Sequence, residues 1–105
     1  MVDAIKHYMG ENVETRLSLD DIAQYTGYSV SHLSSLFKQQ TGESPLHYFN
    51  GLKMQRACHL LTTTNMYINQ ICHKIGIDDC YYFSRLFKKY YGVSPNQYLQ
   101  SIGES

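Results

Sequence analysis

The chain repeats one pattern of residues at a nearly constant spacing, and this repeat constrains the fold more than any other feature. Leu36-Phe37-Lys38 precedes Leu86-Phe87-Lys88 by 50 positions, whereas Gly27 precedes Gly76 by 49. The second copy therefore has one extra residue between Gly76 and Asp79, where a turn tolerates an insertion. A repeat of this period predicts the same local structure twice.

Each copy predicts a helix-turn-helix, because apolar residues recur at helical spacing and no segment alternates as a strand does. In the first copy a helix ends at Gly27, Ser29 caps the next helix, and Gly42 stops it. In the second copy Asp79 takes the place of Ser29, and Gly92 takes that of Gly42. Two helices joined by such a short turn form a helix-turn-helix unit. The predicted fold is all-α, with about seven helices.

A longer helix is predicted between the two copies. Ser44-Pro45 begins it, since serine is a good cap and proline suits the first helical position. We predict one domain in three parts. These are a first helix-turn-helix subdomain over residues 1–50, a linker helix over 45–63 and a second subdomain over 64–105.

The charge of the chain is unevenly distributed, although its formal net charge is zero. Residues 1–27 contain two basic and five acidic side chains, whereas residues 28–101 contain seven basic and three acidic ones. A local basic excess of this kind indicates a surface for nucleic acid. The alternative is a helical protein-interaction module, which needs no such excess. Salt distinguishes the two, because DNA binding weakens steeply with ionic strength.

Several other classes of protein are not indicated. No apolar run approaches the ~20 residues of a membrane span, so no membrane partner is expected. Three cysteines without a CxxC pair indicate free thiols in a reducing cytoplasm. The chain has no glycine-rich phosphate loop, paired catalytic carboxylates or nucleophile elbow, so it is not predicted to be an enzyme.

Two Cys-His dipeptides, Cys58-His59 and Cys72-His73, raise the question of a metal site, with Cys80, His32 and His47 as further ligands. Neighbouring side chains on a helix point about 100° apart, so neither pair is expected to chelate one ion. The spacings typical of zinc motifs are also absent. The sequence therefore predicts neither a metal site nor a cofactor.

The spaced residues of both copies resemble the DNA-binding domain of AraC/XylS-type transcriptional regulators over roughly residues 5–101. The resemblance implies an all-helical domain whose two recognition helices, residues 29–41 and 79–91, enter the major groove of double-stranded operator DNA. It also implies a bacterial, cytoplasmic regulator with an upstream effector or receiver domain, and RNA polymerase as a partner. The matching residues of the first copy are Gly27-Tyr28-Ser29, His32-Leu33, Phe37-Lys38, Gly42, Ser44-Pro45 and Tyr48, those of the connecting helix are Arg56-Ala57 and Leu60-Leu61, and those of the second copy are Ile71, Gly76, Asp79, Tyr82-Phe83-Ser84-Arg85, Phe87-Lys88-Lys89, Gly92, Ser94-Pro95 and Tyr98.

Chemistry and family position together predict the contacts with DNA. Arg85 can donate two hydrogen bonds to guanine, Tyr81 can meet a thymine methyl or a phosphate, and serine hydroxyls discriminate little between bases. We therefore expect the second copy to specify the sequence and the first copy mainly to position the domain. The expected base-contacting residues are Ser31, Ser34, Ser35, Cys80, Tyr81, Ser84 and Arg85.

Phosphate contacts hold the register of a protein on DNA without reading its sequence, and lysine and arginine usually supply them. The expected residues are Lys38, Lys53, Arg56, Lys88 and Lys89. For Arg56, on the connecting helix, the alternative is an ion pair within the domain.

Overall fold

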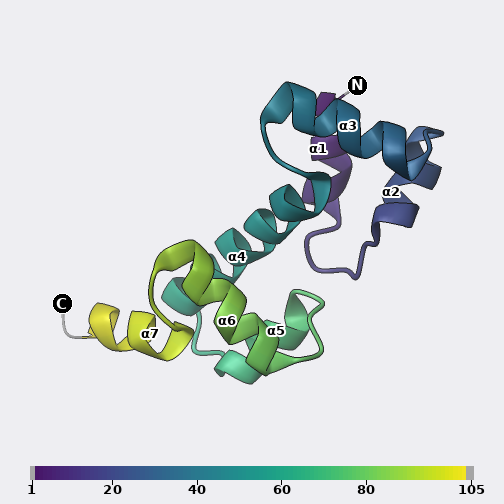
Figure 1. Ribbon diagram of the computed structural model, residues 1–105. Coiled ribbons are helices and arrows are strands. Elements are labelled where there is room, and N and C mark those ends of the chain that lie inside the picture. Colours follow the sequence, from purple (N-terminus) through teal and green to yellow (C-terminus); the bar gives the residue numbers. More distant parts are fainter. Residues whose placement is uncertain (1, 104–105) are drawn as a thin grey trace. The chain divides into compact units, whose positions relative to one another are not determined.

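The computed structural model describes residues 2–103, and within them it has seven helices and no strand. This result confirms the all-α prediction. No helix in this range is long and apolar enough to span a membrane. In chain order the helices are α1 (Val2–Glu11), α2 (Leu19–Thr26), α3 (Val30–Thr41), α4 (Pro45–Thr63), α5 (Ile68–Lys74), α6 (Cys80–Tyr91) and α7 (Pro95–Gly103), as Figure 1 shows.

The chain forms two compact units, each with a hydrophobic core of its own. Unit 1 ends at Leu52 and unit 2 begins at Lys53, so α4 contributes residues to both. The helix predicted over residues 45–63 is present, but its role as a linker stays a prediction, as do the three predicted parts of the domain. The outer ends of that division, residues 1 and 104–105, lie outside the described residues.

The core of unit 1 packs α3 against α1, α2 and the first part of α4. Leu33 and Phe37 form the buried stripe of α3. The ring of Tyr48 meets that of Phe37 edge-on, with 5.5 Å between the centroids. Burial of this apolar stripe leaves the other side of α3 facing solvent. The remaining buried residues of this core are Val2, Ile5, Met9, Ile22, Ala23 and Phe49.

The core of unit 2 is centred on Phe87 of α6, which is fully buried. Its ring lies 4.7 Å from that of Tyr91, 5.7 Å from that of Tyr98 and 6.1 Å from that of Phe83, measured between centroids. Aromatic pairs in such geometries stabilise a core beyond their buried area. The other buried residues here are Met54, Ala57, Leu60, Leu61, Ile71, Cys72, Ile75 and Leu86.

The caps predicted for the two equivalent helices are confirmed. The Ser29 hydroxyl accepts a hydrogen bond from the backbone N–H of His32, and the Asp79 carboxylate accepts two, from Tyr81 and Tyr82. Gly42 and Gly92 end these helices with φ of 84° and 82°, in the left-handed region that favours glycine. Both helices therefore start and stop at equivalent residues.

A capping box also fixes the start of α2. The backbone N–H of Ser18 donates to the Asp21 carboxylate at 2.9 Å, and the backbone N–H of Asp21 donates to the Ser18 hydroxyl at 3.1 Å. The bond from the backbone N–H of Ser18 to the carboxylate first, and the interaction of the Ser18 hydroxyl with the same carboxylate second, hold the pKa of Asp21 below its usual value. The carboxylate therefore stays ionised beside the positive end of the helix dipole.

The two turns differ in length by two residues, one from the predicted insertion and one because α5 ends a position earlier than α2 does. The first turn joins Thr26 of α2 to Val30 of α3, whereas the second joins Lys74 of α5 to Cys80 of α6. In the second turn the N–H of Ile77 reaches back to the carbonyl of Cys72, 3.1 Å away. This bond folds the longer turn against the end of α5, as in a Schellman motif.

Candidate nucleic-acid interface

Helix α6 has one buried and one exposed side. Its buried stripe packs into the core of unit 2, and the opposite side carries aromatic, hydroxyl, thiol and basic groups. A helix of this kind can present both hydrogen-bonding and charged groups to a groove of DNA. Of the residues predicted for DNA contact, Tyr81, Arg85, Lys88 and Lys89 are exposed, whereas Cys80 and Ser84 are half-buried.

Arg85 and Tyr81 lie one helical turn apart and contact each other. The guanidinium carbon of Arg85 is 5.8 Å from the centroid of the Tyr81 ring, and Tyr81 is 73% exposed. This is a cation–π arrangement, which restrains the arginine side chain above the first turns of the helix. The structure thus brings together two of the residues predicted to contact bases.

Helix α3 presents a different set of groups at the equivalent positions. Ser31, Ser35 and Lys38 are exposed and Ser34 is half-buried. The face has hydroxyls where α6 has Tyr81 and Arg85. Its lysine matches Lys88, because both helices have 12 residues and start 50 positions apart.

His32 is a candidate that the sequence prediction missed. It is exposed, and it lies in the first turn of α3, beside Ser31. Its ring meets that of Tyr28 edge-on, with 4.7 Å between the centroids. Such a contact restrains the imidazole next to the predicted base-contacting serines. The sequence could have indicated His32 as a DNA contact, because it lies in the first turn of the predicted recognition helix.

Lys53 does not lie where a phosphate contact requires it. The residue is only 5% exposed, and its Nζ donates to the carbonyl of Ile75, just after the end of α5. A cation suits this position because the C-terminal end of a helix is partially negative. This burial speaks against the predicted phosphate contact, so we omit Lys53 from the interface. Arg56, on the same helix, is exposed and remains a candidate.

Replacing Lys53 with methionine should therefore lower the stability of unit 2. The Ile75 carbonyl would lose a charged donor, which costs about 1–3 kcal/mol of unfolding free energy. Urea unfolding followed by circular dichroism measures the change, with Lys89→Met as the exposed control that should leave stability unchanged. If instead Lys53→Met weakens DNA binding at low salt with no loss of stability, Lys53 belongs with the phosphate contacts.

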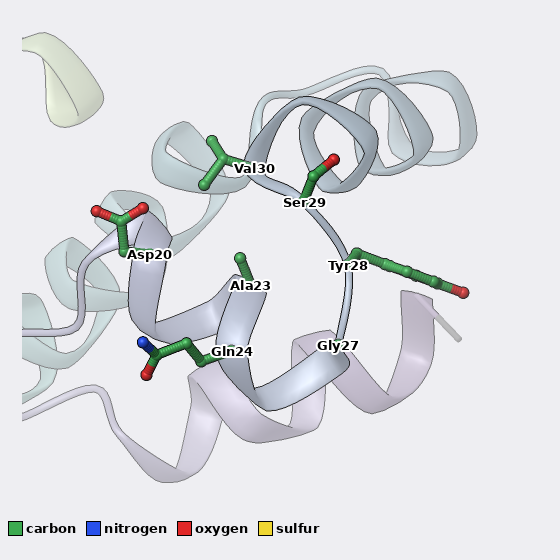
Figure 2. Close-up of a pocket in the computed structure, with 7 residues that line it drawn as sticks. All are labelled: Asp20, Ala23, Gln24, Gly27, Tyr28, Ser29 and Val30. Atoms are coloured by element: carbon green, nitrogen blue, oxygen red, sulfur yellow. The ribbon is translucent and has the colours of Figure 1, made fainter.

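A shallow hollow lies at the turn of the first helix-turn-helix (Figure 2). Ala23 of α2 and Val30 of α3 face it, and Gly27 and Tyr28 form the turn beside it. Its seven lining residues include one acidic side chain and no basic one, which disfavours a phosphate. The hollow is where the two helices of the motif meet. The remaining lining residues are Asp20, Gln24 and Ser29.

Comparison with known proteins finds close counterparts of this arrangement. The family model described as a helix-turn-helix domain matches residues 12–101. The MmsAB operon regulatory protein of Pseudomonas aeruginosa is 38% identical over 101 residues, which cover 96% of this chain and 33% of that protein. The chain thus spans about a third of the length of that relative.

Two solved structures of bacterial regulators also resemble this chain in sequence and in fold. The C-terminal domain of AraT, a response regulator from Geobacillus stearothermophilus, is 35% identical and superposes with a TM-score of 0.91, over 95% of this chain and 84% of that one. A transcriptional regulator from Chromobacterium violaceum, described by its AraC-type DNA-binding domain, is 34% identical. Its TM-score is 0.83, over 91% of this chain and 86% of that one.

Proposed function

The chain belongs to the AraC-type helix-turn-helix family, and on this premise we propose that it binds double-stranded DNA sequence-specifically within a bacterial transcription regulator. The observation that carries the proposal is the matched pair of helices α3 and α6. Each has 12 residues, a buried stripe and an opposite side with hydrogen-bonding and basic groups. A helix with such a side fits the major groove, where every base pair has a distinct pattern of donors and acceptors.

The proposed roles of the side chains follow from their chemistry. Arg85 reads a guanine through two hydrogen bonds, and Tyr81 both holds the guanidinium and meets the neighbouring base or phosphate. Serine hydroxyls bond to several bases, so the face of α3 mainly positions its unit. The proposed base-contacting set is Ser31, Ser34, Ser35, Cys80, Tyr81, Ser84 and Arg85, and the phosphate-contacting set is Lys38, Arg56, Lys88 and Lys89.

The proposed cellular role is that of one domain in a longer regulator. The relative from Pseudomonas is about three times as long as the matched region, and the relative from Geobacillus is described as a response regulator. We propose an upstream effector or receiver domain, a contact with RNA polymerase, and action on DNA in the cytoplasm. The contribution of this domain is binding rather than catalysis.

Selection of bound sites from a random pool of DNA duplexes tests the proposal. A sequence-specific domain should enrich a defined motif, with the best conserved positions opposite the residues of α6. Enrichment of no motif, with binding that does not change between 50 and 200 mM salt, would instead indicate a protein-interaction module, since phosphate contacts make binding fall by orders of magnitude across about this range.

Replacing either Lys38 or Lys88 with glutamine should make DNA binding less sensitive to salt. Each proposed phosphate contact contributes about one unit to the slope of log affinity against log salt concentration. Fluorescence anisotropy over a salt series measures this slope for the selected site and for an unrelated duplex. The loss should be the same for both duplexes, because a phosphate contact carries no sequence information. A variant that loses affinity for the selected site alone would be a base reader.

A further inference from the structure

Three side chains with metal-binding atoms converge where α5 ends and α6 begins. Sγ of Cys72, a ring nitrogen of His73 and Sγ of Cys80 all lie within 4.8 Å of one another. The distance from Cys80 Sγ to His73 Nε2 is 3.9 Å. The sequence alone did not predict that the adjacent pair Cys72-His73 of α5 could chelate an ion. The structure changes this expectation, because α6 places Cys80 beside the pair as a third ligand.

The cluster has a buried side and an open side. Cys72 is fully buried, Cys80 is half-buried and His73 is exposed. The folded turn between them, held by the bond from Ile77 to Cys72, keeps the start of α6 against the end of α5. An ion at this position would therefore have two protein ligands behind it and a path to solvent past the imidazole.

The three equivalent positions of the first copy also lie close together. The residues equivalent to Cys72, His73 and Cys80 are Ala23, Gln24 and Val30, 49, 49 and 50 positions earlier. All three line the hollow at the first turn (Figure 2). The helix-turn-helix frame thus brings these positions together in both copies, and the second copy alone fills them with thiols and an imidazole.

We propose that Cys72, His73 and Cys80 form a binding site for one thiophilic metal ion, with Zn²⁺ as its occupant and solvent in the fourth position. Zinc binds cysteine sulfur at about 2.3 Å and histidine nitrogen at about 2.0–2.1 Å, in a tetrahedron. Such ligands lie roughly 3.5–3.8 Å from one another. Here the three atoms lie within 4.8 Å of one another, with 3.9 Å between Cys80 Sγ and His73 Nε2. Small changes of side-chain torsion complete the site.

The surroundings of Cys72 determine which ions can bind. Its thiol donates to the carbonyl of Ile77 at 3.1 Å. An ion must displace both the proton and the hydrogen bond, which an oxygen-preferring ion such as Mg²⁺ or Ca²⁺ does not do. The site is accordingly selective for zinc and for other ions with high affinity for thiolate.

Occupancy would tie α5 to the first residue of α6. Cys80 lies next to Tyr81 and in the same first turn as the Asp79 cap. A bound ion would therefore stabilise unit 2 and fix the start of the recognition helix. Cys80 also belongs to the proposed base-contacting set, and a thiolate bound to the ion would not contact a base. The metal site can still be tested apart from DNA binding, since its test involves the protein alone.

Titration with Co²⁺ and Zn²⁺ under a non-thiol reductant tests the site. Co²⁺ should produce the thiolate charge-transfer and tetrahedral visible bands, saturating at one ion per chain, and Zn²⁺ should bleach them. Zn²⁺ should also raise the melting temperature of the metal-free protein, because an ion that binds only the folded state stabilises it. Absence of thiolate bands with the reduced protein would overturn the proposal.

Two variants replace a ligand with the residue at the equivalent position of the first copy. The first helix-turn-helix already accommodates these residues, so the variants are expected to fold. His73→Gln and Cys80→Val should each weaken metal binding by at least about tenfold, judged from the effect of removing even a supporting residue. The matched control is Cys58→Ser with His59→Gln, the other Cys-His pair, which should leave the bands and the affinity unchanged. Circular dichroism of the metal-free variants verifies their fold.

The opposite pattern would overturn the inference. If the control removes the cobalt bands while Cys80→Val keeps them, the ion binds at another cysteine. DNA binding by the metal-free protein is measured separately, so failure of the metal site would leave the proposed function intact, and failure of DNA binding would leave the metal site intact.

Discussion

Replacing Arg85 with alanine is expected to lower affinity for the selected DNA site about ten- to a hundredfold and to relax the preference at one base pair. A bidentate arginine–guanine contact discriminates by about 1–3 kcal/mol, and about 1.4 kcal/mol corresponds to a factor of ten. The contact between Arg85 and the Tyr81 ring strengthens this expectation, since it reduces the freedom that the guanidinium loses on binding. Affinity for an unrelated duplex should fall by far less, because it depends on charge alone.

Arg85→Lys separates the geometry of the guanidinium from its charge. Lysine keeps the positive charge but lacks the planar fork, so this variant should retain non-specific affinity and still lose the base preference. Ser34→Ala and Ser35→Ala are the matched changes on α3, where we expect smaller effects on sequence preference. If these serine variants relax the motif more than Arg85→Ala does, the division of labour between the two helices is the reverse of our proposal.

Replacing Phe87 with alanine should bring unit 2 close to unfolding. Replacing a fully buried phenylalanine with alanine lowers the free energy of unfolding by about 3–5 kcal/mol. A unit of this size has a free energy of unfolding of only about 3–8 kcal/mol, judged from typical values per residue. The ring contacts Phe83, Tyr91 and Tyr98, so its removal leaves three aromatic neighbours around a cavity. Thermal unfolding followed by circular dichroism should show an early transition or a loss of helix at room temperature.

Two further variants separate the size of the side chain from its position. Phe87→Leu keeps most of the apolar volume and should cost far less than Phe87→Ala. Phe37→Ala is the equivalent change in unit 1, where the ring contacts Tyr48, and it should lower the stability of that unit while the core of unit 2 keeps its own contacts. If Phe87→Ala and Phe87→Leu are equally mild, Phe87 is not the centre of the core that its burial indicates.

Much of the fold could be predicted from the sequence because it is determined by local chemistry. The caps at Ser29 and Asp79, the stops at Gly42 and Gly92, and the apolar stripes each act within one or two turns of helix. The repeat then required the same motif twice. The exposed groups of α6 followed from the same periodicity, because the residues opposite a buried stripe face solvent.

Two features of the site depend instead on how helices pack. Nothing in the sequence distinguishes Lys53 from an exposed lysine, and its burial beneath the end of α5 became visible only with α4 and α5 in place. His73 and Cys80 are seven residues apart and have no recognisable zinc spacing. The sequence by itself determined the two helix-turn-helix units and the chemistry of their exposed faces, since these depend on neighbours along the chain. Only the tertiary structure decided that Lys53 points inward and that Cys72, His73 and Cys80 meet, because distances between side chains on different helices depend on packing and not on spacing.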